Sequence, residues 1–521
     1  MKRLPIAKTE IKEIAEGNFC YADKTRFIRD LVDDGHTYYF LSRPRRFGKS
    51  LFVDTLRAAF AGEKDSFKGL FLENNWDWDK KYPVISISFG AGTVETKEEL
   101  NLKIDEKLNF IKERYQLGSL INKTVSGRFE KLIELLNEKF NLPVVVLIDE
   151  YDKPILDNIT KENVAEIREQ LSSFYSVLKD SSRYLKFVFL TGVSRFSKTS
   201  IFSKLNNITD ISLVEKYADI CGITQHDLES VFADYLKDVD LEKVEYWYDG
   251  YNFGGSNLYN PYDVLMFLWE KRYKPYWFET GTPTFLLELI KQKQYFLPEM
   301  ERVDVAYTQL AEFDVSNIEL NVLLFQAGYL TIHNTYQLGE HIYYTLKIPN
   351  NEVRVGLNDY LLRMFYTSGS NAPARSELYK RVYHAISQNK PQDLEPAFYS
   401  FFESIPHDWY RHNDIARFEG FFSSMFYAFF AAQGFHTIPE DTTNKGKIDL
   451  TILTNTGIFI FEFKMKSNPK NALEQIQEKK YQQKYLTQGK EVFLVGIAFD
   501  EEARNISGFE WKKMKSSVKK L

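Results

Sequence analysis

Residues 38–51 read YYFLSRPRRFGKSL, an apolar run followed by a basic loop that ends in Gly-Lys-Ser. The next segment, 52–57, has the composition of a helix. A strand, a loop ending in Gly-Lys-Ser and a helix are the setting of a phosphate-binding P-loop. Gly48 lets backbone amides approach phosphate oxygens, and the helix N-terminus adds unpaired N–H groups. Lys49 supplies a charge for the outer phosphates, and the Ser50 hydroxyl can bind Mg²⁺.

The loop departs from the usual pattern G-x-x-x-x-G-K-[ST], because Arg43 stands where the first glycine is expected. Taken alone, the loop also fits an ordinary basic turn between a strand and a helix. A second segment favours nucleotide binding. Residues 143–148, PVVVLI, are typical of a strand buried on both faces of a parallel sheet, and Asp149 and Glu150 follow them. This is the Walker B arrangement, in which Asp149 holds the Mg²⁺ shell and Glu150 deprotonates the attacking water.

Residues 187–190, FVFL, form a third apolar run, and Thr191, Ser194 and Arg195 follow it. P-loop ATPases often carry a polar sensor at the tip of the neighbouring strand, a role open to Thr191 or Ser194. Arg195 could reach a γ-phosphate, although a simple turn after a strand explains these residues equally well. Within this interpretation Ser50 and Asp149 hold the Mg²⁺. The expected nucleotide-binding residues are Arg45, Arg46, Phe47, Gly48, Lys49, Ser50, Leu51, Asp149, Thr191 and Arg195.

The combined motifs resemble those of the AAA-ATPase-like family of bacterial proteins. The resemblance rests on YADKT at 21–25, RPRRFGKS at 43–50, LIDEYD at 147–152, TGVSRF at 191–196, YDGY at 248–251 and YWFETG at 276–281. It covers roughly the first half of the chain. The family also has Arg at the position of Arg43, and the resemblance implies ATP binding without identifying a substrate.

The bulk composition limits the class of protein. The 521 residues are enough for two to four domains of about 100–200 residues each. A formal net charge of −5 argues against a protein that coats nucleic acid along its whole surface, but it allows a local basic channel. Two distant cysteines, Cys20 and Cys221, fit a reducing cytoplasm. The N-terminus lacks a signal-peptide core and the most apolar stretch, 418–435, contains Glu419, so we expect a cytoplasmic protein without a membrane partner.

The order of segments predicts three domains in a multidomain α/β chain. Residues 1–210 alternate helix-like and strand-like segments, as in a P-loop ATPase core built on a parallel sheet. Residues 211–375 predict a helical lid and then a winged-helix-like region, with a helix at 319–328, a hairpin within 329–348 and a further helix. In multidomain ATPases such a region more often serves packing or regulation than DNA reading. Residues 376–521 predict a second α/β core.

This C-terminal core contains charged residues on apolar strands. Residues 447–454, KIDLTILT, and 458–464, IFIFEFK, read as two strands joined by a tight turn. In such a hairpin Asp449 lies about opposite Glu462, and Lys464 shares a face with Glu462. Burying charge costs on the order of several kcal/mol, so the cluster needs a reason. Either a structural salt bridge or a divalent metal held by the two carboxylates provides one.

The pattern Asp…Glu-x-Lys over a hairpin resembles the active site of the PD-(D/E)XK nuclease superfamily, which implies a restriction-endonuclease-like core. Glu419, at the start of an apolar helix, matches the helix acid of many such nucleases. Gln475 lies where they often place a polar accessory residue. The resemblance implies a catalytic set of Asp449, Glu462, Lys464 and Glu419, with Mg²⁺ or Mn²⁺ held by Asp449 and Glu462.

The leading hypothesis is an ATPase fused to a metal-dependent nuclease that hydrolyses nucleic-acid phosphodiesters. DNA, and a role in defence or in handling mobile elements, are suggested by analogy with ATPase–nuclease fusions. The alternatives are a nucleotide-controlled switch that binds nucleic acid or a protein partner without cleavage, and a scaffold with both sites decayed. Arg195 or the pair Arg45 and Arg46 could act in trans within a homo-oligomer.

Lysines make the C-terminal end locally basic, which fits contact with a phosphate backbone, although a solvated helix face explains any one of them equally well. They are Lys466, Lys470, Lys479, Lys480, Lys484, Lys512, Lys513, Lys515, Lys519 and Lys520.

Overall fold

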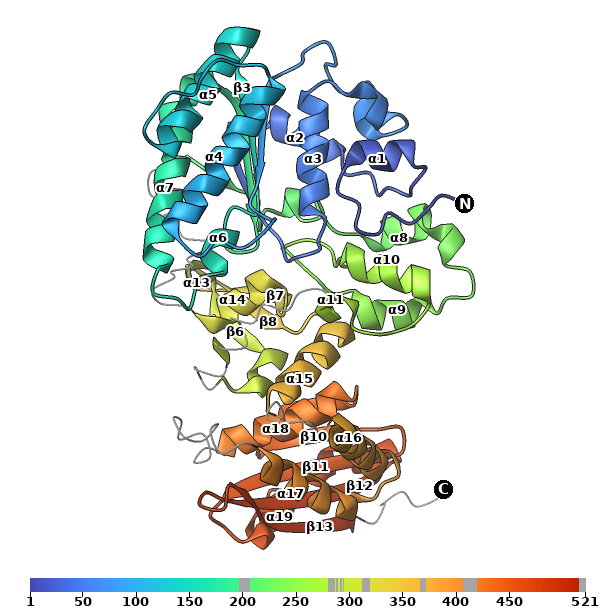
Figure 1. The fold of residues 1–521 in the computed structure, drawn as a ribbon. Coiled ribbons are helices and arrows are strands. Elements are labelled where there is room, and N and C mark those ends of the chain that lie inside the picture. Colours follow the sequence, from blue (N-terminus) through green and yellow to red (C-terminus); the bar gives the residue numbers. More distant parts are fainter. Residues whose placement is uncertain are drawn as a thin grey trace. The chain divides into compact units, whose positions relative to one another are not determined.

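The computed structural model describes residues 1–195, 207–279, 295–311, 319–365, 372–405 and 419–514, with a few single positions between 280 and 294. The chain forms two compact units, which are Met1–Leu286 with Asp304–Asn350 and Leu287–Val303 with Asn351–Leu521. Each unit combines helices with a central sheet (Figure 1), which confirms the multidomain α/β class. Among the described residues, no helix combines the length and the apolar character needed to span a membrane.

A five-stranded parallel sheet forms the centre of the first unit, in the order β2–β3–β4–β1–β5. Its strands are β1 (Tyr38–Ser42), β2 (Val84–Ser88), β3 (Val144–Asp149), β4 (Leu185–Gly192) and β5 (Thr209–Asp210). Every residue of β1 and β3 is buried, as expected for parallel strands covered on both faces. The three strands that carry the sequence motifs, β1, β3 and β4, are neighbours. Their carboxyl ends therefore bring the motifs to one edge of the sheet.

Two groups of helices cover this sheet. The helices α4 (Lys97–Arg114), α5 (Val125–Phe140) and α7 (Val164–Asp180) pack together on one side, and α3 (Lys49–Phe60) lies on the other (Figure 1). Threonine side chains cap the amino ends of α4 and α5, so each helix begins where the sequence supplies a capping oxygen. The unit also contains α1 (Ile11–Glu16), α2 (Arg26–Asp33) and α6 (Lys153–Leu156).

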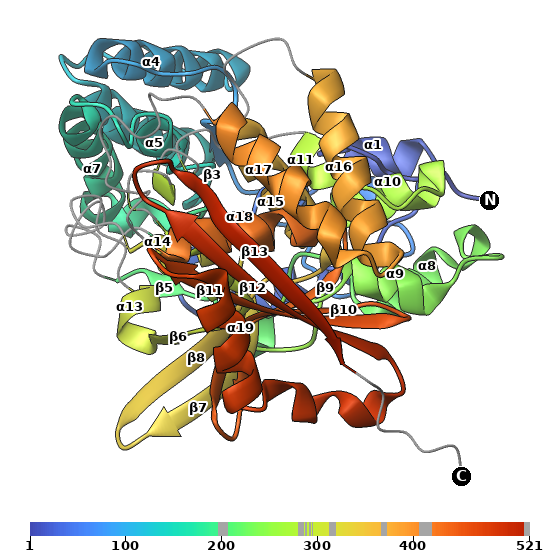
Figure 2. The same ribbon diagram turned by 90° about the horizontal axis from the view of Figure 1, so that it is seen from below.

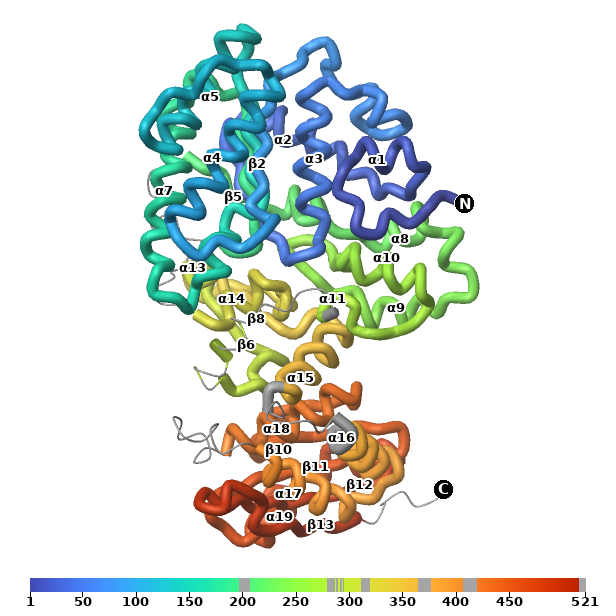
Figure 3. The backbone as a smooth tube through the Cα atoms, viewed as in Figure 1, coloured from blue at the N-terminus to red at the C-terminus, as the bar shows by residue number. Residues whose placement is uncertain are grey.

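The chain before β1 packs against the helical region that follows the sheet. This region contains α8 (Gln225–Val231), α9 (Leu241–Tyr248), α10 (Pro261–Glu270) and α11 (Tyr276–Glu279). Leu4 and Ile6 pack onto its core, which includes Leu228 and Val264. Figure 3 shows the N-terminal segment between α1 and the helices α8 and α10. Segments about two hundred residues apart in sequence thus form one wall of the unit.

A small antiparallel hairpin completes the first unit. It consists of β7 (Thr331–Leu338) and β8 (His341–Lys347), preceded by α14 (Leu320–Ala327). These are the helix and the hairpin expected within 319–348. A strand that the sequence analysis did not predict, β6 (Val303–Ala306), pairs with β8 and is followed by α13 (Tyr307–Ala311). The next helix, α15 (Asn351–Phe365), belongs to the second unit.

The second unit is built on a mixed sheet in the order β13–β12–β11–β10–β9. The strands are β9 (His436–Thr443), β10 (Gly446–Leu453), β11 (Gly457–Met465), β12 (Glu491–Asp500) and β13 (Asn505–Met514). Only β11 and β12 pair in parallel, and the remaining pairs are antiparallel. Besides α15, the helices are α16 (Ala372–Ser387), α17 (Leu394–Ser404), α18 (Glu419–Ala432) and α19 (Pro469–Glu478).

The alternation along β11 divides this unit into two packing layers. Phe461 and Phe463 face α18, where both rings contact Phe426 at centroid distances of 6.4 and 5.2 Å. Ile460 points to the opposite face and packs with Ile476 of α19. Figure 2 shows α17 and α18 on one face of the sheet and α19 on the other. Glu462 and Lys464 share the face of Ile460, so they lie on the α19 side.

Candidate functional site

The loop between β1 and α3 turns twice through the left-handed backbone region. Arg46 has φ 63° and Gly48 has φ 94°. Gly48 directly precedes α3, where a residue without Cβ adopts this conformation at little cost. The loop therefore delivers Lys49 and Ser50 to the first turn of a twelve-residue helix, whose free amides favour an anion.

Lys49 is folded into its own loop. Its side chain is buried, and Nζ donates hydrogen bonds to the carbonyl oxygens of Arg43 at 2.9 Å and Pro44 at 2.8 Å. Burial lowers the pKa of Lys49, while the nearby carboxylates of Asp149 and Glu150 raise it. A phosphate group would have to take the place of the two carbonyl oxygens as the partner of this ammonium group.

The two acids at the end of β3, Asp149 and Glu150, lie beside the start of α3. The Ser50 hydroxyl donates to Oδ2 of Asp149 at 2.6 Å, and the Glu150 amide donates to Oδ1 at 3.0 Å. Burial raises the pKa of Asp149, and the bond from Ser50 lowers it. Glu150 has φ 52°, and its carboxylate fills the space beside Gly90, where an added Cβ would lie 3.0 Å from Oε2. Ser50 and Asp149 can therefore share a cation, with Glu150 next to them.

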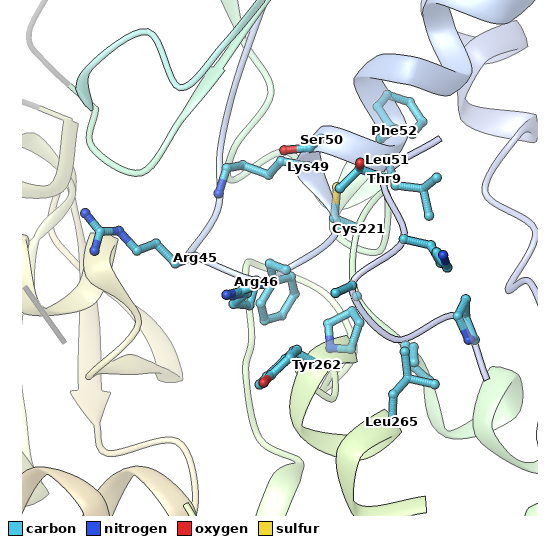
Figure 4. A pocket seen from close by; sticks show the side chains of 18 of the residues that line it. Thr9, Arg45, Arg46, Lys49, Ser50, Leu51, Phe52, Cys221, Tyr262 and Leu265 are labelled. Atoms are coloured by element: carbon cyan, nitrogen blue, oxygen red, sulfur yellow. The ribbon is translucent and has the colours of Figure 1, made fainter. Parts of the chain in front are cut away.

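A pocket of about 580 Å³ opens in front of these residues (Figure 4), within the usual range for small-molecule sites. Lys49 and Ser50 lie at one end, and Tyr262 of α10 lies close to Arg46, whose guanidinium is 4.9 Å from the ring centroid. The Arg45 side chain points away from Lys49 (Figure 4). The expected residues that line this pocket are Arg45, Arg46, Phe47, Gly48, Lys49, Ser50, Leu51 and Glu150.

Three expected residues do not line the pocket. Asp149 lies behind Ser50, one hydrogen bond away. Thr191 is the cross-strand neighbour of Asp149, and its hydroxyl is buried with no hydrogen-bond partner in the described part of the chain. Arg195 donates from Nε and Nη2 to Asp210 at 2.9 and 2.7 Å, and its amide donates to Gln326. The structure thus holds Arg195 in an internal ion pair and does not bring it to the pocket.

The other candidate sensor is also committed to a partner. The Ser194 amide and hydroxyl both donate to Oδ2 of Asp152, with 2.6 Å for the amide. Burial raises the pKa of Asp152, and these bonds lower it. Asp152 therefore shapes the turn after β4, and Ser194 is part of that turn. The last residue of the TGVSRF motif, Phe196, lies outside the described residues, as do Thr280 and Gly281 of YWFETG.

Pattern reasoning missed the walls of the pocket that lie outside the P-loop. The N-terminal segment contributes one wall, formed by Pro5, Ala7, Lys8, Thr9, Cys20, Tyr21, Ala22 and Lys24. The region after the sheet contributes another wall, formed by Ile220–Ile223, Phe232, Pro261, Tyr262 and Leu265. A signal existed for the first wall only, because YADKT at 21–25 was part of the family resemblance. Both cysteines of the chain, Cys20 and Cys221, lie here as free thiols.

The second site forms where β10 and β11 diverge. Leu450 of β10 pairs with Phe461 of the antiparallel strand β11. One residue further along the same register, Asp449 lies opposite Glu462, as predicted. The Asp449 carboxylate accepts a hydrogen bond from the Phe463 amide at 2.7 Å. Burial raises the pKa of Asp449 to about 6. Burial, and then the charge of Asp449, raise the pKa of Glu462 to about 8.

Several polar side chains converge on Glu462. Lys464 Nζ lies 3.3 Å from Oε1, which also accepts from the Gln475 amide group. Glu419, the first described residue of α18, contributes negative charge that acts on Glu462 and on Lys464. Tyr481, which the sequence analysis missed, is buried within hydrogen-bonding reach of Gln475, and its pKa is raised by burial and by Glu462. The structure therefore brings all four expected catalytic residues of this region together.

The donor set fits a divalent cation. Within the described ranges, no group of three or more His, Cys, Asp and Glu side chains is arranged as a metal site, and a cation held here would have Asp449 and Glu462 as its carboxylate ligands. Oε2 of Glu462 is buried and has no hydrogen-bond partner among the described residues. Two neighbouring acids with raised pKa values are favoured in their charged forms by a cation between them. Hard oxygen ligands with open positions suit Mg²⁺ or Mn²⁺.

The C-terminal lysines have mixed surroundings. Lys466, Lys484 and Lys513 form ion pairs with Glu501, Asp441 and Glu491, and Lys512 donates to Gln477. Lys470, Lys479 and Lys480 are exposed on or next to α19. Lys515, Lys519 and Lys520 lie outside the described residues.

Comparison with known proteins identifies two regions of the chain. Residues 5–202 match the family model described as "Predicted AAA-ATPase", and residues 417–509 match the model of the PD-(D/E)XK nuclease superfamily. A protein of Azotobacter chroococcum mcd 1, named "Uncharacterized protein in vnfD 5'region", is 43% identical over 512 residues, which cover 98% of each chain. The chain therefore belongs to the AAA-ATPase-like family, and it carries a C-terminal region that matches the PD-(D/E)XK nuclease superfamily.

Proposed function

We propose that this protein hydrolyses ATP in the P-loop pocket and cleaves nucleic-acid phosphodiesters at the C-terminal acidic site. The observation that carries the proposal is the pair Asp449 and Glu462, which lie side by side next to Lys464 with one buried carboxylate oxygen left without a partner in the described part of the chain. A purely structural salt bridge would satisfy both acids. This arrangement instead leaves Oε2 of Glu462 available as a ligand of a cation.

In the proposed nuclease step, Asp449 and Glu462 hold Mg²⁺ or Mn²⁺. The cation would supply Lewis acidity toward the scissile phosphate and lower the pKa of a bound water. Lys464 is placed to orient that water or to stabilise negative charge developing on the phosphate. Gln475 fixes the orientation of the Glu462 carboxylate through Oε1. Attack by the water oxygen on phosphorus breaks the bond to the leaving sugar oxygen, which takes up a proton.

In the proposed ATPase step, Lys49 exchanges its two carbonyl partners for phosphate oxygens. Ser50 and Asp149, already 2.6 Å apart, hold the Mg²⁺ that accompanies ATP. Glu150 accepts a proton from the attacking water at the edge of the pocket. Hydrolysis at this site is proposed to control cleavage at the other. Nucleic acid, with DNA favoured by analogy with ATPase–nuclease fusions, is the proposed substrate of the second site.

The decisive experiment measures cleavage by the purified full-length chain. Linear and circular DNA and RNA are incubated with Mg²⁺ or Mn²⁺, with and without ATP. We expect Asp449→Asn, which keeps the side-chain volume, to lower cleavage at least about 100-fold, because one metal ligand loses its charge. Glu474→Gln on α19 removes one exposed acid near the site and serves as the matched control, with wild-type cleavage expected.

Two outcomes would redirect the proposal. Cleavage that survives in Asp449→Asn would place the activity elsewhere or in a contaminant. No cleavage under any condition, together with retained binding of nucleic acid, would favour the nucleotide-controlled switch. Glu150→Gln tests the link between the sites, because it should preserve ATP binding, abolish turnover, and alter only the ATP-dependent part of cleavage.

A further inference from the structure

We propose that Arg43, at the position of the first P-loop glycine, is a positioning residue that joins the phosphate loop to the wall of the nucleotide pocket. Replacing it with the usual glycine should therefore weaken nucleotide binding. This inference rests on the proposed ATP-binding function of the pocket.

The Arg43 side chain is fully buried, and its hydrogen bonds within the described part of the chain all go to backbone carbonyl oxygens. Nη1 donates to the carbonyls of Ser42 and Ser212, each at 2.8 Å. Nη2 donates to the carbonyls of Tyr217 and Ala218, each at 3.1 Å. Burial lowers the pKa of Arg43 to about 10, so the guanidinium keeps its charge at neutral pH. Charged donors make stronger hydrogen bonds to carbonyl oxygens than neutral ones do.

These carbonyls belong to a segment that leads directly into the pocket. Two residues beyond Ala218 the chain reaches Ile220, Cys221 and Gly222, which line the pocket. The segment Glu215–Tyr217 is one short turn of 3-10 helix, with backbone hydrogen bonds from the Tyr217 and Ala218 amides to Val214 and Glu215. Arg43 ties this turn to the phosphate loop. The position of the pocket wall thus depends on a side chain of the phosphate loop.

The same residue fixes the other end of the site. The Arg43 carbonyl is one of the two acceptors that hold Lys49 Nζ in place. Its guanidinium also lies 4.2 Å from the ring centroid of Phe253, and Phe253 contacts Phe47 of the loop edge to face at 5.4 Å. Gly222 keeps this contact possible, because a Cβ there would lie 2.7 Å from the Phe47 ring. The phosphate loop, the Lys49 side chain and the pocket wall at Ile220–Gly222 therefore pack together around Arg43.

The backbone itself makes no demand for glycine at this position. Arg43 lies outside the left-handed region, and the loop makes its left-handed turns at Arg46 and Gly48 instead. A glycine at 43 would relieve no strain. It would remove the charged donor from four carbonyl groups and leave a hole where one of the largest fully buried side chains of the described residues now lies.

The test measures nucleotide affinity of the full chain by titration with a fluorescent ATP analogue and Mg²⁺. We expect Arg43→Gly to bind at least tenfold more weakly than the wild type at a temperature where circular dichroism shows both folded. Arg57→Ala is the matched control, because Arg57 also bonds two partners, Asp54 and Glu63, but lies away from the pocket lining. We expect its affinity to stay within twofold of wild type.

A chemical rescue separates positioning from a general loss of stability. In Arg43→Ala, millimolar methylguanidinium should restore most of the lost affinity, and ammonium at the same concentration should not. If the glycine and alanine variants do not fold, Arg43→Lys decides, because a lysine keeps the charge but cannot reach carbonyls on both sides. We expect it to raise KM for ATP at least fivefold with little change in kcat.

An Arg43→Gly chain that is folded and binds ATP as tightly as the wild type would overturn the inference. So would an Arg43→Lys chain with unchanged KM where the glycine chain does not fold. Failure of the wild type itself to bind any nucleotide would instead refute the proposed ATP site, so the two failures are distinguishable.

Discussion

The two candidate sites satisfy their charges in opposite ways. In the first unit, Lys49 and Asp149 already have partners from the chain, with Lys49 on two carbonyl oxygens and Asp149 on the Ser50 hydroxyl. In the second unit, burial raises the pKa values of Asp449 and Glu462, the charge of Asp449 raises that of Glu462 further, and one oxygen of Glu462 has no partner in the described part of the chain. A ligand enters the first site by exchanging hydrogen bonds. A cation enters the second by removing a repulsion.

This difference has a thermodynamic consequence. When a ligand binds a site whose groups are already paired, its hydrogen bonds replace existing ones, and only the difference in free energy between the two sets favours binding. The affinity of such a site therefore depends on how the loop is held. When a cation binds between two neighbouring carboxylates, the removal of their repulsion contributes fully to the binding free energy. The affinity of such a site therefore depends on whether the carboxyl groups are protonated. The nucleotide pocket should therefore respond most to changes in geometry, and the acidic site to changes in pH.

The largest expected effect is on Lys49. Lys49→Ala should weaken ATP binding about 100-fold, because one charged partner of the phosphates is lost. Binding of Mn²⁺ at Asp449 and Glu462 should not change, since the two sites use separate residues. Isothermal titration with each ligand measures both. Lys179→Ala, which removes an exposed lysine from α7, is the control and should change neither. An equal loss of affinity for ATP and for Mn²⁺ would contradict the view that the two sites bind their ligands independently.

A smaller effect is expected from pH on the acidic site. The free protein holds a proton on Glu462 below about pH 8 and on Asp449 below about pH 6. Mn²⁺ must displace the Glu462 proton, so its affinity should rise about tenfold between pH 6.5 and 7.5 and level off above pH 8. Titration calorimetry in two buffers of different ionisation enthalpy counts the released proton.

The same protonation affects stability with a definite sign. The Glu462 pKa is higher in the folded chain than in the unfolded one, so the folded state binds the proton more tightly. Without metal, stability should therefore fall as pH rises from about 4.5 to about 8. Saturating Mn²⁺ should remove that decline, and Glu462→Gln should remove the part above about pH 6 without metal, because Asp449 contributes to the decline only up to about pH 6. A metal-free melting temperature that is constant over this range would contradict the assignment.

The smallest expected effect concerns Thr191, the exception to the paired pattern of the first site. Thr191→Val keeps the shape but removes a buried hydroxyl that has no partner in the described part of the chain. Stability should stay the same or rise by up to about 1 kcal/mol, while ATP turnover should fall about threefold to tenfold if the hydroxyl serves the reaction. Melting curves and steady-state hydrolysis measure the two. A lower melting temperature with normal turnover would show a structural hydroxyl.

Much of both sites follows from short-range sequence rules. The strand, loop and helix around Lys49 are contiguous, so one pattern predicts all three. The register of Asp449 and Glu462 follows from a tight turn and a two-residue period, with no long loop in between. Burial of Val144–Ile148 follows from an unbroken apolar run. In each case the residues that decide the structure are close together in the chain.

What the sequence could not predict depends on distant contacts. The pocket walls at Cys20–Ala22 and Ile220–Ile223 meet only after the whole sheet is assembled. Arg195 was expected to face a phosphate, but its partner Asp210 lies on the two-residue strand β5, which is too short to have a pattern of its own. Tyr481 reaches the acidic site from a 3-10 turn after α19, and no period or motif marks it.

The strand order of the first unit bears on how the protein is made. The strand β1 pairs with β4 and β5, which are completed only at Asp210, and the carbonyl partners of Arg43 extend to Ala218. A ribosome synthesising this chain therefore exposes the apolar run Tyr38–Leu41 long before its neighbours exist. Such delayed long-range pairing is slow and leaves strand edges open to misassembly. The apolar run Tyr38–Leu41 is therefore synthesised well before the residues that complete its sheet, and it stays without its neighbouring strands during that interval.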